Sequence, residues 1–231
     1  FGAPPATLLI HIALSAHPTP RTPTATTHSA PPLRTPLRTR DGSESADPRG
    51  GRARRAGLLW AMILNSAVSG LNIAGSYKTF GTQQAALNSD SFLSLVGSLS
   101  AILGNAAGRF FWGSISDMFG FKRPFMALTT LQAAVMLNYK ALAASRLTFT
   151  IATVLMLFCM GGTFAMFPAQ TMRMYGAAGP SVYSILFTAF GCAALMGPIL
   201  GNALLSRGGF ELVYKSLGLL SFVSLGLATL L

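Results

Sequence analysis

Six blocks of apolar residues, each roughly 20 residues long, follow one another from Gly57 onward. An α-helix of about 20 residues is long enough to cross the ~30 Å hydrocarbon core of a lipid bilayer. A helix also satisfies its backbone polar groups internally, which a chain surrounded by lipid must do. The blocks predict an all-α membrane protein with six transmembrane helices, over approximately residues 57–77, 91–114, 124–142, 148–172, 181–205 and 210–231.

Composition and the spacing of polar residues favour the same fold class. Hydrophobic residues make up 51% of the chain and charged residues only 10%, which is too apolar for an ordinary soluble domain. Turn-like segments separate the blocks at residues 78–90, 117–123, 143–147, 173–180 and 206–209. The lipid bilayer is therefore a predicted partner, and the chain is predicted to be an integral membrane protein that crosses the bilayer several times.

Residues 1–56 form a different unit, rich in Pro, Thr, Ala, Ser and Arg. Prolines at this density oppose helix formation, and few large apolar side chains are present to form a core. We predict a disordered arm over residues 1–56, followed by a six-helix membrane domain over residues 57–231. The sequence begins at Phe1 without a methionine, so we expect an incomplete or processed N-terminus.

The net charge of +11 is concentrated near the N-terminus, where eight of the 17 basic residues lie within the first 55 positions. This arm has no interleaved aromatic residues and no recognition motif, so nucleic acid is not a predicted partner. Basic residues also flank the first block and follow the second, which predicts a cytoplasmic start by the positive-inside rule. They are Arg49, Arg52, Arg54, Arg55, Lys122 and Arg123.

Metal, cofactor and enzyme chemistry find no support in the sequence. Cys159 and Cys192 lie far apart inside apolar blocks, where small apolar packing is the expected role. The three histidines all belong to the N-terminal arm and no ligand spacing connects them. The sequence shows no nucleophile–base pair and no paired carboxylates, so we expect no enzyme, no cofactor and no metal site.

The second predicted helix carries one charged residue inside its apolar stretch, Arg109. An arginine in lipid is costly, so it normally faces a protein interior or a water-filled path. Arg109 precedes Asp117 by eight residues, about 12 Å along a helix, which places its Cα well inside the hydrocarbon region. Two interpretations stay open. The guanidinium binds an anion near the midplane, or it extends back to the cytoplasmic headgroups.

Polar and small residues recur at helical spacing in three of the blocks. Ser94, Ser98 and Asn105 share the face of Arg109. The neighbouring face of the same helix, which permits close helix approach, contains Gly97, Ala101, Gly104 and Gly108. Asn65, Ser69 and Asn72 share a face of the first helix, and Ser184, Thr188 and Cys192 share a face of the fifth. These polar groups either line a cavity or bridge helices by hydrogen bonds.

The loop after the second helix, Gly113-x-x-x-Asp117-x-x-Gly120-x-Lys122-Arg123, resembles the cytoplasmic signature of the major facilitator superfamily of transporters. Four stretches look most like the C-terminal half of the oxalate/formate antiporter and monocarboxylate transporter branch. They are residues 70–78, 105–117, 164–169 and 183–198. The alternative is a chance loop between two hydrophobic helices.

The resemblance implies that the six helices correspond to the seventh through twelfth of a twelve-helix transporter, with a missing N-terminal six-helix half as partner. It also implies that Arg109 binds the carboxylate of a small organic anion during alternating access, with Asn105, Ser98 and Asn72 as further substrate-binding candidates. Asn105 stands where those transporters often carry a proton-handling aspartate. The eleventh helix here, residues 181–205, lacks the basic residue of the oxalate branch.

The resemblance further implies a conformational latch in the loop, formed by Gly113, Asp117, Gly120, Lys122 and Arg123. Asp117 is expected to pair with Lys122 or Arg123; the alternative is that these charges only fix topology. A second function hypothesis is a truncated, non-transporting membrane fragment or helix-association module.

Overall fold

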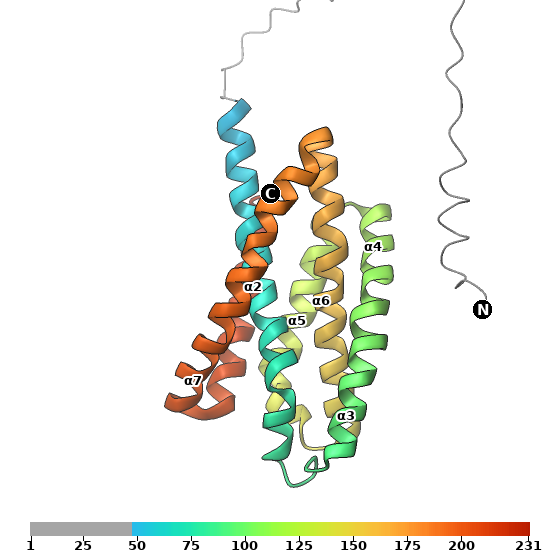
Figure 1. Cartoon of the computed structure of the whole chain (residues 1–231), viewed down its shortest axis with the longest axis vertical. Helices are drawn as coiled ribbons and strands as arrows, with labels where there is room; N and C mark the ends of the chain where they lie inside the picture. Colours follow the sequence, from blue (N-terminus) through green and yellow to red (C-terminus); the bar gives the residue numbers. More distant parts are fainter. Residues whose placement is uncertain (1–47) are drawn as a thin grey trace, which may run out of the picture. The chain divides into compact units, whose positions relative to one another are not determined.

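A computed structural model describes residues 48–231, which belong to one unit made almost entirely of helices (Figure 1). In chain order the elements are α2 (Pro48–Thr82), α3 (Asp90–Leu99), the π-helical segment η1 (Ser100–Ala106), α4 (Ala107–Phe119), α5 (Lys122–Leu142), α6 (Arg146–Tyr175), the 3₁₀ turn η2 (Gly176–Ala178) and α7 (Gly179–Thr229). The all-helical fold class is confirmed for the described residues.

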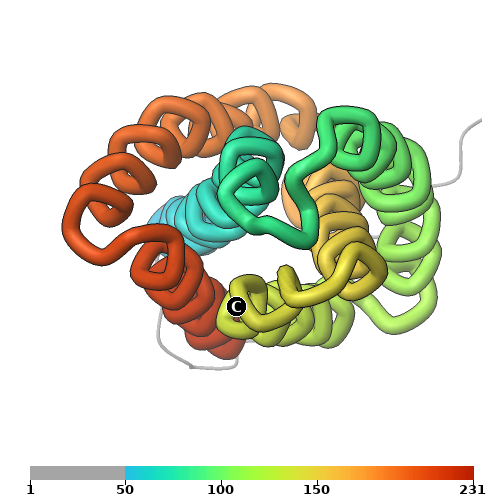
Figure 2. The backbone as a smooth tube through the Cα atoms, turned by 90° about the horizontal axis from the view of Figure 1, so that it is seen from below, coloured from blue at the N-terminus to red at the C-terminus, as the bar shows by residue number. Residues whose placement is uncertain are grey.

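Two of the three positive-φ glycines among the described residues lie where one helical stretch ends and the next begins. Gly120, between α4 and α5, has φ +76°, and Gly209, inside α7, has φ +66°. Backbone in this region favours glycine, because a Cβ would be strained there. Gly208 is also non-helical, so α7 consists of two helical parts joined by a tight turn, visible from below in Figure 2. The helix break predicted at residues 206–209 is confirmed.

Three helical stretches are long and apolar enough to cross a membrane. They are Gly50–Thr82, Asp90–Phe119 and Arg146–Thr229, the last of which includes η2 and the break at Gly209. The lengths of these stretches agree with the predicted membrane location.

The boundary predicted for the N-terminal arm is wrong by several residues. α2 begins at Pro48, so residues 48–56 are helical rather than disordered. Pro48 is the last proline of the arm and stands at the first helical position, where its missing N–H is not needed. In the run after it, residues 49–56, four arginines and two alanines favour helix and outnumber the two glycines, which disfavour it. The rest of the predicted arm, residues 1–47, lies outside the described residues.

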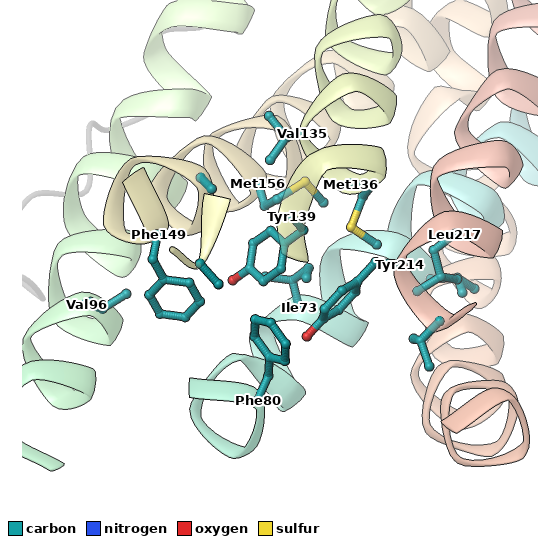
Figure 3. Packing of buried hydrophobic residues seen from close by; sticks show 14 of the residues in the cluster. Ile73, Phe80, Val96, Val135, Met136, Tyr139, Phe149, Met156, Tyr214 and Leu217 are labelled. Atoms are coloured by element: carbon teal, nitrogen blue, oxygen red, sulfur yellow. The ribbon is translucent and has the colours of Figure 1, made fainter. Parts of the chain in front are cut away.

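An aromatic cluster fills the core at the end of the bundle opposite Asp117 (Figure 3). The Phe80 ring lies 5.2 Å from that of Tyr214 and 5.9 Å from that of Tyr139. The ring centres of Tyr139 and Phe149 lie 5.7 Å apart, and the Tyr139 hydroxyl forms a hydrogen bond with the Thr153 hydroxyl at 2.7 Å. The cluster joins α2, α5, α6 and the second part of α7.

A second cluster lies near the Asp117 end and joins the start of α5 to α6. The Phe125 ring stacks on that of Phe121 at 5.3 Å and meets that of Phe167 edge-on at the same distance. Between the two clusters, a buried polar network links α2, α5 and α6. The Ser66 hydroxyl donates to Oε1 of Gln132 and bonds with the Thr163 hydroxyl, both at 3.1 Å, while Nε2 of Gln132 donates to the Ser66 carbonyl at 3.0 Å.

Candidate functional site

One continuous rod, formed by α3, η1 and α4, carries Arg109. Its middle is wound more widely than an α-helix, because the N–H of Ala107 bonds to the carbonyl of Ile102, five residues back. Such π-helical turns are frequent at functional sites. The apolar pattern of residues 91–114 predicts an ordinary α-helix here, so the wide turn is a difference from that prediction. The wide turn ends at Ala106, three residues before Arg109.

The Arg109 side chain is directed toward the N-terminal part of its rod, away from the Asp117 end. Its Nε donates to Oδ1 of Asn105 at 3.1 Å, one turn earlier. Its guanidinium carbon lies 5.0 Å from the centre of the Phe164 ring on α6, a cation–π distance. Arg109 is exposed, and the ion pairs among residues 48–231 do not include it. Its charge is therefore available to a ligand.

Phe164 belongs to an aromatic shelf formed with three residues of α7: Tyr183, Phe187 and Phe190. The Phe164 ring lies 4.8 Å from that of Phe190 and 6.4 Å from that of Phe187. Phe187 in turn stacks on Phe190 at 5.5 Å and contacts Tyr183 at 5.8 Å. This shelf fixes the ring on which the Arg109 guanidinium rests.

Three glycines bring the rod of Arg109 into direct contact with α6. A Cβ on Gly104 would lie 2.7 Å from the carbonyl oxygen of Val154, and one on Gly108 would clash with the carbonyl of Phe158. From the other side, a Cβ on Gly161 would clash with the carbonyl of Asn105. The close-packing face predicted for Gly97, Ala101, Gly104 and Gly108 is thus confirmed at Gly104 and Gly108, whereas Ala101 is exposed. This contact places Arg109 one residue away from a tight backbone approach.

Ser98 and Asn72 do not contact Arg109. Ser98 is exposed, and its hydroxyl donates to the Ser94 carbonyl of its own helix at 3.1 Å. Asn72 is only 8% exposed and accepts a hydrogen bond from the Ser76 hydroxyl at 3.4 Å. It lines a cavity of about 210 Å³ between α2 and α7, to which the rod of Arg109 contributes no residue. The structure brings together Arg109 and Asn105 but not the other two candidates.

The partner expected for Asp117 is different in the structure. Its Oδ1 pairs with Nη2 of Arg173 at 2.6 Å, whereas Lys122 or Arg123 was expected. Nη1 of the same Arg173 donates a second hydrogen bond, to the Ser116 carbonyl at 3.2 Å. Arg173 therefore sits at the C-terminal end of α4, where the helix dipole favours a cation. The pair joins α4 to the last turn of α6.

The other loop residues have separate surroundings. Lys122 opens α5, and its Nζ donates to the carbonyl of Thr229 at the end of α7, at 2.9 Å. Arg123 is exposed. Gly113 lies half-buried in α4, where a Cβ would meet that of Ala165 at an ordinary 3.6 Å. Gly120 supplies the left-handed turn described above.

Sequence reasoning missed Phe164, Arg173 and Gln132 as site or support residues. Phe164 and Arg173 lie over 50 residues from their partners, so helical spacing cannot connect them. Gln132 did carry a usable signal, because a lone amide inside an apolar block must find a partner when buried.

Comparison with characterised proteins identifies relatives whose names refer to small carboxylates. The chain is 31% identical to apicoplast pyruvate carrier 2 of Toxoplasma gondii over 167 residues, which are 71% of this chain and 24% of the carrier. It is 24% identical to the oxalate:formate antiporter of Oxalobacter formigenes over 174 residues, 74% of this chain and 41% of the antiporter. Apicoplast pyruvate carrier 1 of Toxoplasma gondii matches at 30% over 129 residues, 55% of this chain and 21% of that carrier.

The chain thus spans less than half the length of these curated relatives. The family model of the Major Facilitator Superfamily matches residues 57–231, which covers every described helix from the third turn of α2 onward. Together with the long apolar helices, this match makes the chain a multi-pass integral membrane protein. It belongs to the major facilitator superfamily of transporters.

Proposed function

We propose that this chain carries a small organic anion, a monocarboxylate or a similar compound, across a membrane as the C-terminal half of a secondary transporter. Arg109 is the observation that carries the proposal, because it is an arginine inside an apolar rod whose charge no described carboxylate neutralises. The names of the relatives support the substrate class, since pyruvate, oxalate and formate are all small carboxylates.

The contacts of Arg109 suggest how the anion binds. Asn105 occupies the Nε hydrogen, and Phe164 covers one face of the guanidinium. The terminal Nη1 and Nη2 atoms are left for a ligand, and together they match the two oxygens of a carboxylate. The carboxylate would therefore bind end-on, and the methyl group of a substrate such as pyruvate would lie against the aromatic shelf.

The proposal includes six membrane spans. α2, the rod α3–η1–α4, α5, α6 and the two parts of α7 would each cross the bilayer once. α5 has 21 residues, which corresponds to about 31 Å of helix and matches the hydrocarbon thickness. A second six-helix half would complete the cavity, and rocking of the two halves would expose Arg109 to each side in turn.

The Asp117–Arg173 pair would hold one of these conformations. It connects α4, which carries Arg109, to α6, which carries Phe164. A contact that differs between the two orientations can shift their equilibrium by its differential free energy.

The experiment is uptake of labelled pyruvate, formate and oxalate by the full-length protein in liposomes. Arg109→Ala should abolish uptake, and Arg109→Lys should retain part of it, since a lysine keeps the charge without the planar fork. Arg146→Gln is the matched control. Arg146 also stacks on a ring, that of Phe92 at 5.2 Å, but it lies at a helix start and bonds to the Ala86 carbonyl. Wild-type uptake in both Arg109 variants, at equal protein content, contradicts the proposal.

A further inference from the structure

A cavity of about 330 Å³ lies at the end of the bundle that carries Lys122. It is lined by Arg55 of α2, Phe121 and Lys122 at the start of α5, Gln170 and Met174 of α6, and Leu231. One part of this lining is cationic and hydrogen-bonding, and the other part is apolar. The cavity contains none of the residues of the Arg109 site.

Arg55 and Lys122, the two cations of this cavity, have hydrogen-bond donors that no protein group occupies among the described residues. Nζ of Lys122 gives one hydrogen to the Thr229 carbonyl at 2.9 Å, and an ammonium group has three. Arg55 is exposed and takes part in none of the ion pairs of residues 48–231. The neighbouring turn of α2 adds Arg52 and Arg54, and it is attached to α6 by the Tyr175 hydroxyl, which donates to the Arg52 carbonyl at 2.9 Å.

Among residues 48–231, the acidic side chain at this end of the bundle is Asp117, which Arg173 already occupies. At the opposite end Lys78 pairs with Asp90, and Lys140 and Lys215 share Glu211, each at 2.7 Å, while Arg146 and Arg207 take part in none of these ion pairs. Unpaired positive charge is more concentrated around the cavity, where Arg55 and Lys122 lie beside Arg52 and Arg54 of α2.

We propose that this cavity binds the headgroup of an anionic phospholipid. The phosphate would lie between Arg55 and Lys122, and the start of an acyl chain would run along Phe121 and Met174. A basic pocket next to an apolar wall at the end of membrane-crossing helices fits a phospholipid better than inorganic phosphate. Only the phospholipid has an acyl chain that can pack on the apolar wall. This end is also the one predicted to face the cytoplasm, whose leaflet carries the anionic lipids.

The test is native mass spectrometry of the purified full-length protein with added phosphatidylglycerol or phosphatidylcholine of equal chain length. Wild-type protein should retain phosphatidylglycerol preferentially. Arg55→Gln and Lys122→Gln should each reduce its retention roughly fivefold, in line with the contribution of one basic residue near a membrane surface. Arg55→Lys and Lys122→Arg keep the charge and should retain the lipid. Arg146→Gln and Arg207→Gln remove the same charge elsewhere and should have no effect.

Three results would overturn the assignment. Equal retention of the two lipids by wild-type protein excludes selectivity for the anionic headgroup. Undiminished retention in Arg55→Gln and Lys122→Gln places the lipid elsewhere. Displacement of phosphatidylglycerol by millimolar inorganic phosphate identifies the ligand as a free phosphate. Lipid retention is measured without transport, so this test is independent of the proposed carrier activity.

Discussion

Arg109 and Asn105 form a neutral-acceptor pair, in which Nε of the guanidinium donates to an amide oxygen 3.1 Å away. An amide orients the arginine without cancelling its charge, whereas a carboxylate at the same position would do both. The pair therefore leaves a fixed cation with its two terminal nitrogens free, which is the state that a carboxylate ligand requires.

Replacing Asn105 by aspartate should turn this pair into an internal ion pair that competes with the substrate. A charge-assisted hydrogen bond is stronger than a neutral one by about 1–2 kcal/mol, so the KM for a carboxylate should rise roughly 5- to 30-fold. Asn105→Ala, which removes the acceptor without adding charge, should change KM far less. Concentration-dependent uptake into liposomes measures both, and equal KM values for the two variants would contradict the competition.

Gly108→Ala should destabilise the protein, because the new Cβ would clash with the backbone of Phe158 on α6. Overpacking of this kind typically costs about 1–3 kcal/mol, so the thermal unfolding temperature in detergent should fall by several degrees. Gly75→Ala is the control on α2, where a Cβ meets no atom within 4 Å and the better helix propensity should make the change neutral or slightly stabilising. Similar unfolding temperatures for both variants would show that the contact between the rod and α6 is not tight.

Gln132→Leu should weaken the contact of α5 with α2 and α6. Gln132 is 2% exposed, and its side chain both accepts from the Ser66 hydroxyl and donates to the Ser66 carbonyl. Loss of these bonds should lower the free energy of unfolding by about 1–3 kcal/mol. Asn138→Leu is the control on the same helix, because Asn138 is exposed and bonds only to the Ala134 carbonyl one turn away. A larger loss of stability in the control would refute the assigned role.

Asp117→Asn should reduce the transport rate more than the apparent substrate affinity, because it breaks the Arg173 pair and shifts the equilibrium between the inward and outward orientations. The pair is exposed, with 43% and 69% of the two side chains accessible, so its loss should alter overall stability by less than about 1 kcal/mol. Exchange of the two charges, in Asp117→Arg with Arg173→Asp, should restore part of the rate. Normal rates in Asp117→Asn at normal protein content would leave the loop as a topology signal.

The sequence was sufficient for the helices and the breaks between them, because both depend on local properties. Apolar runs of membrane length and glycine-bearing segments stand next to each other in the chain, and the break at Gly209 falls inside the segment predicted for it. The start of α2 differs from the prediction for an equally local reason. The arm as a whole is rich in proline, but its prolines stop at Pro48, where the helix begins.

Contacts between distant segments could not be predicted in the same way. The choice of Arg173 over Lys122 as the partner of Asp117 depends on how α6 packs against α4, and no spacing along the chain records it. Asn72 and Arg109 are both polar residues in apolar helices, and the sequence does not distinguish their surroundings. In the fold, Asn72 lines a cavity beside α7, whereas Arg109 does not. The π-helical segment was equally hidden, since its residues would also suit an α-helix.

The wide winding of η1 determines the direction in which Arg109 points from its rod. Compared with an α-helix, a π turn accommodates one additional residue, and one residue corresponds to a rotation of about 100° around the axis. If the same residues were rewound as a plain α-helix with none removed, everything after them would be turned by about that angle, including Arg109 and Asp117. The same side chains would then point to other neighbours without any substitution. The seven residues from Ser100 to Ala106 therefore determine which neighbours the rest of the rod meets.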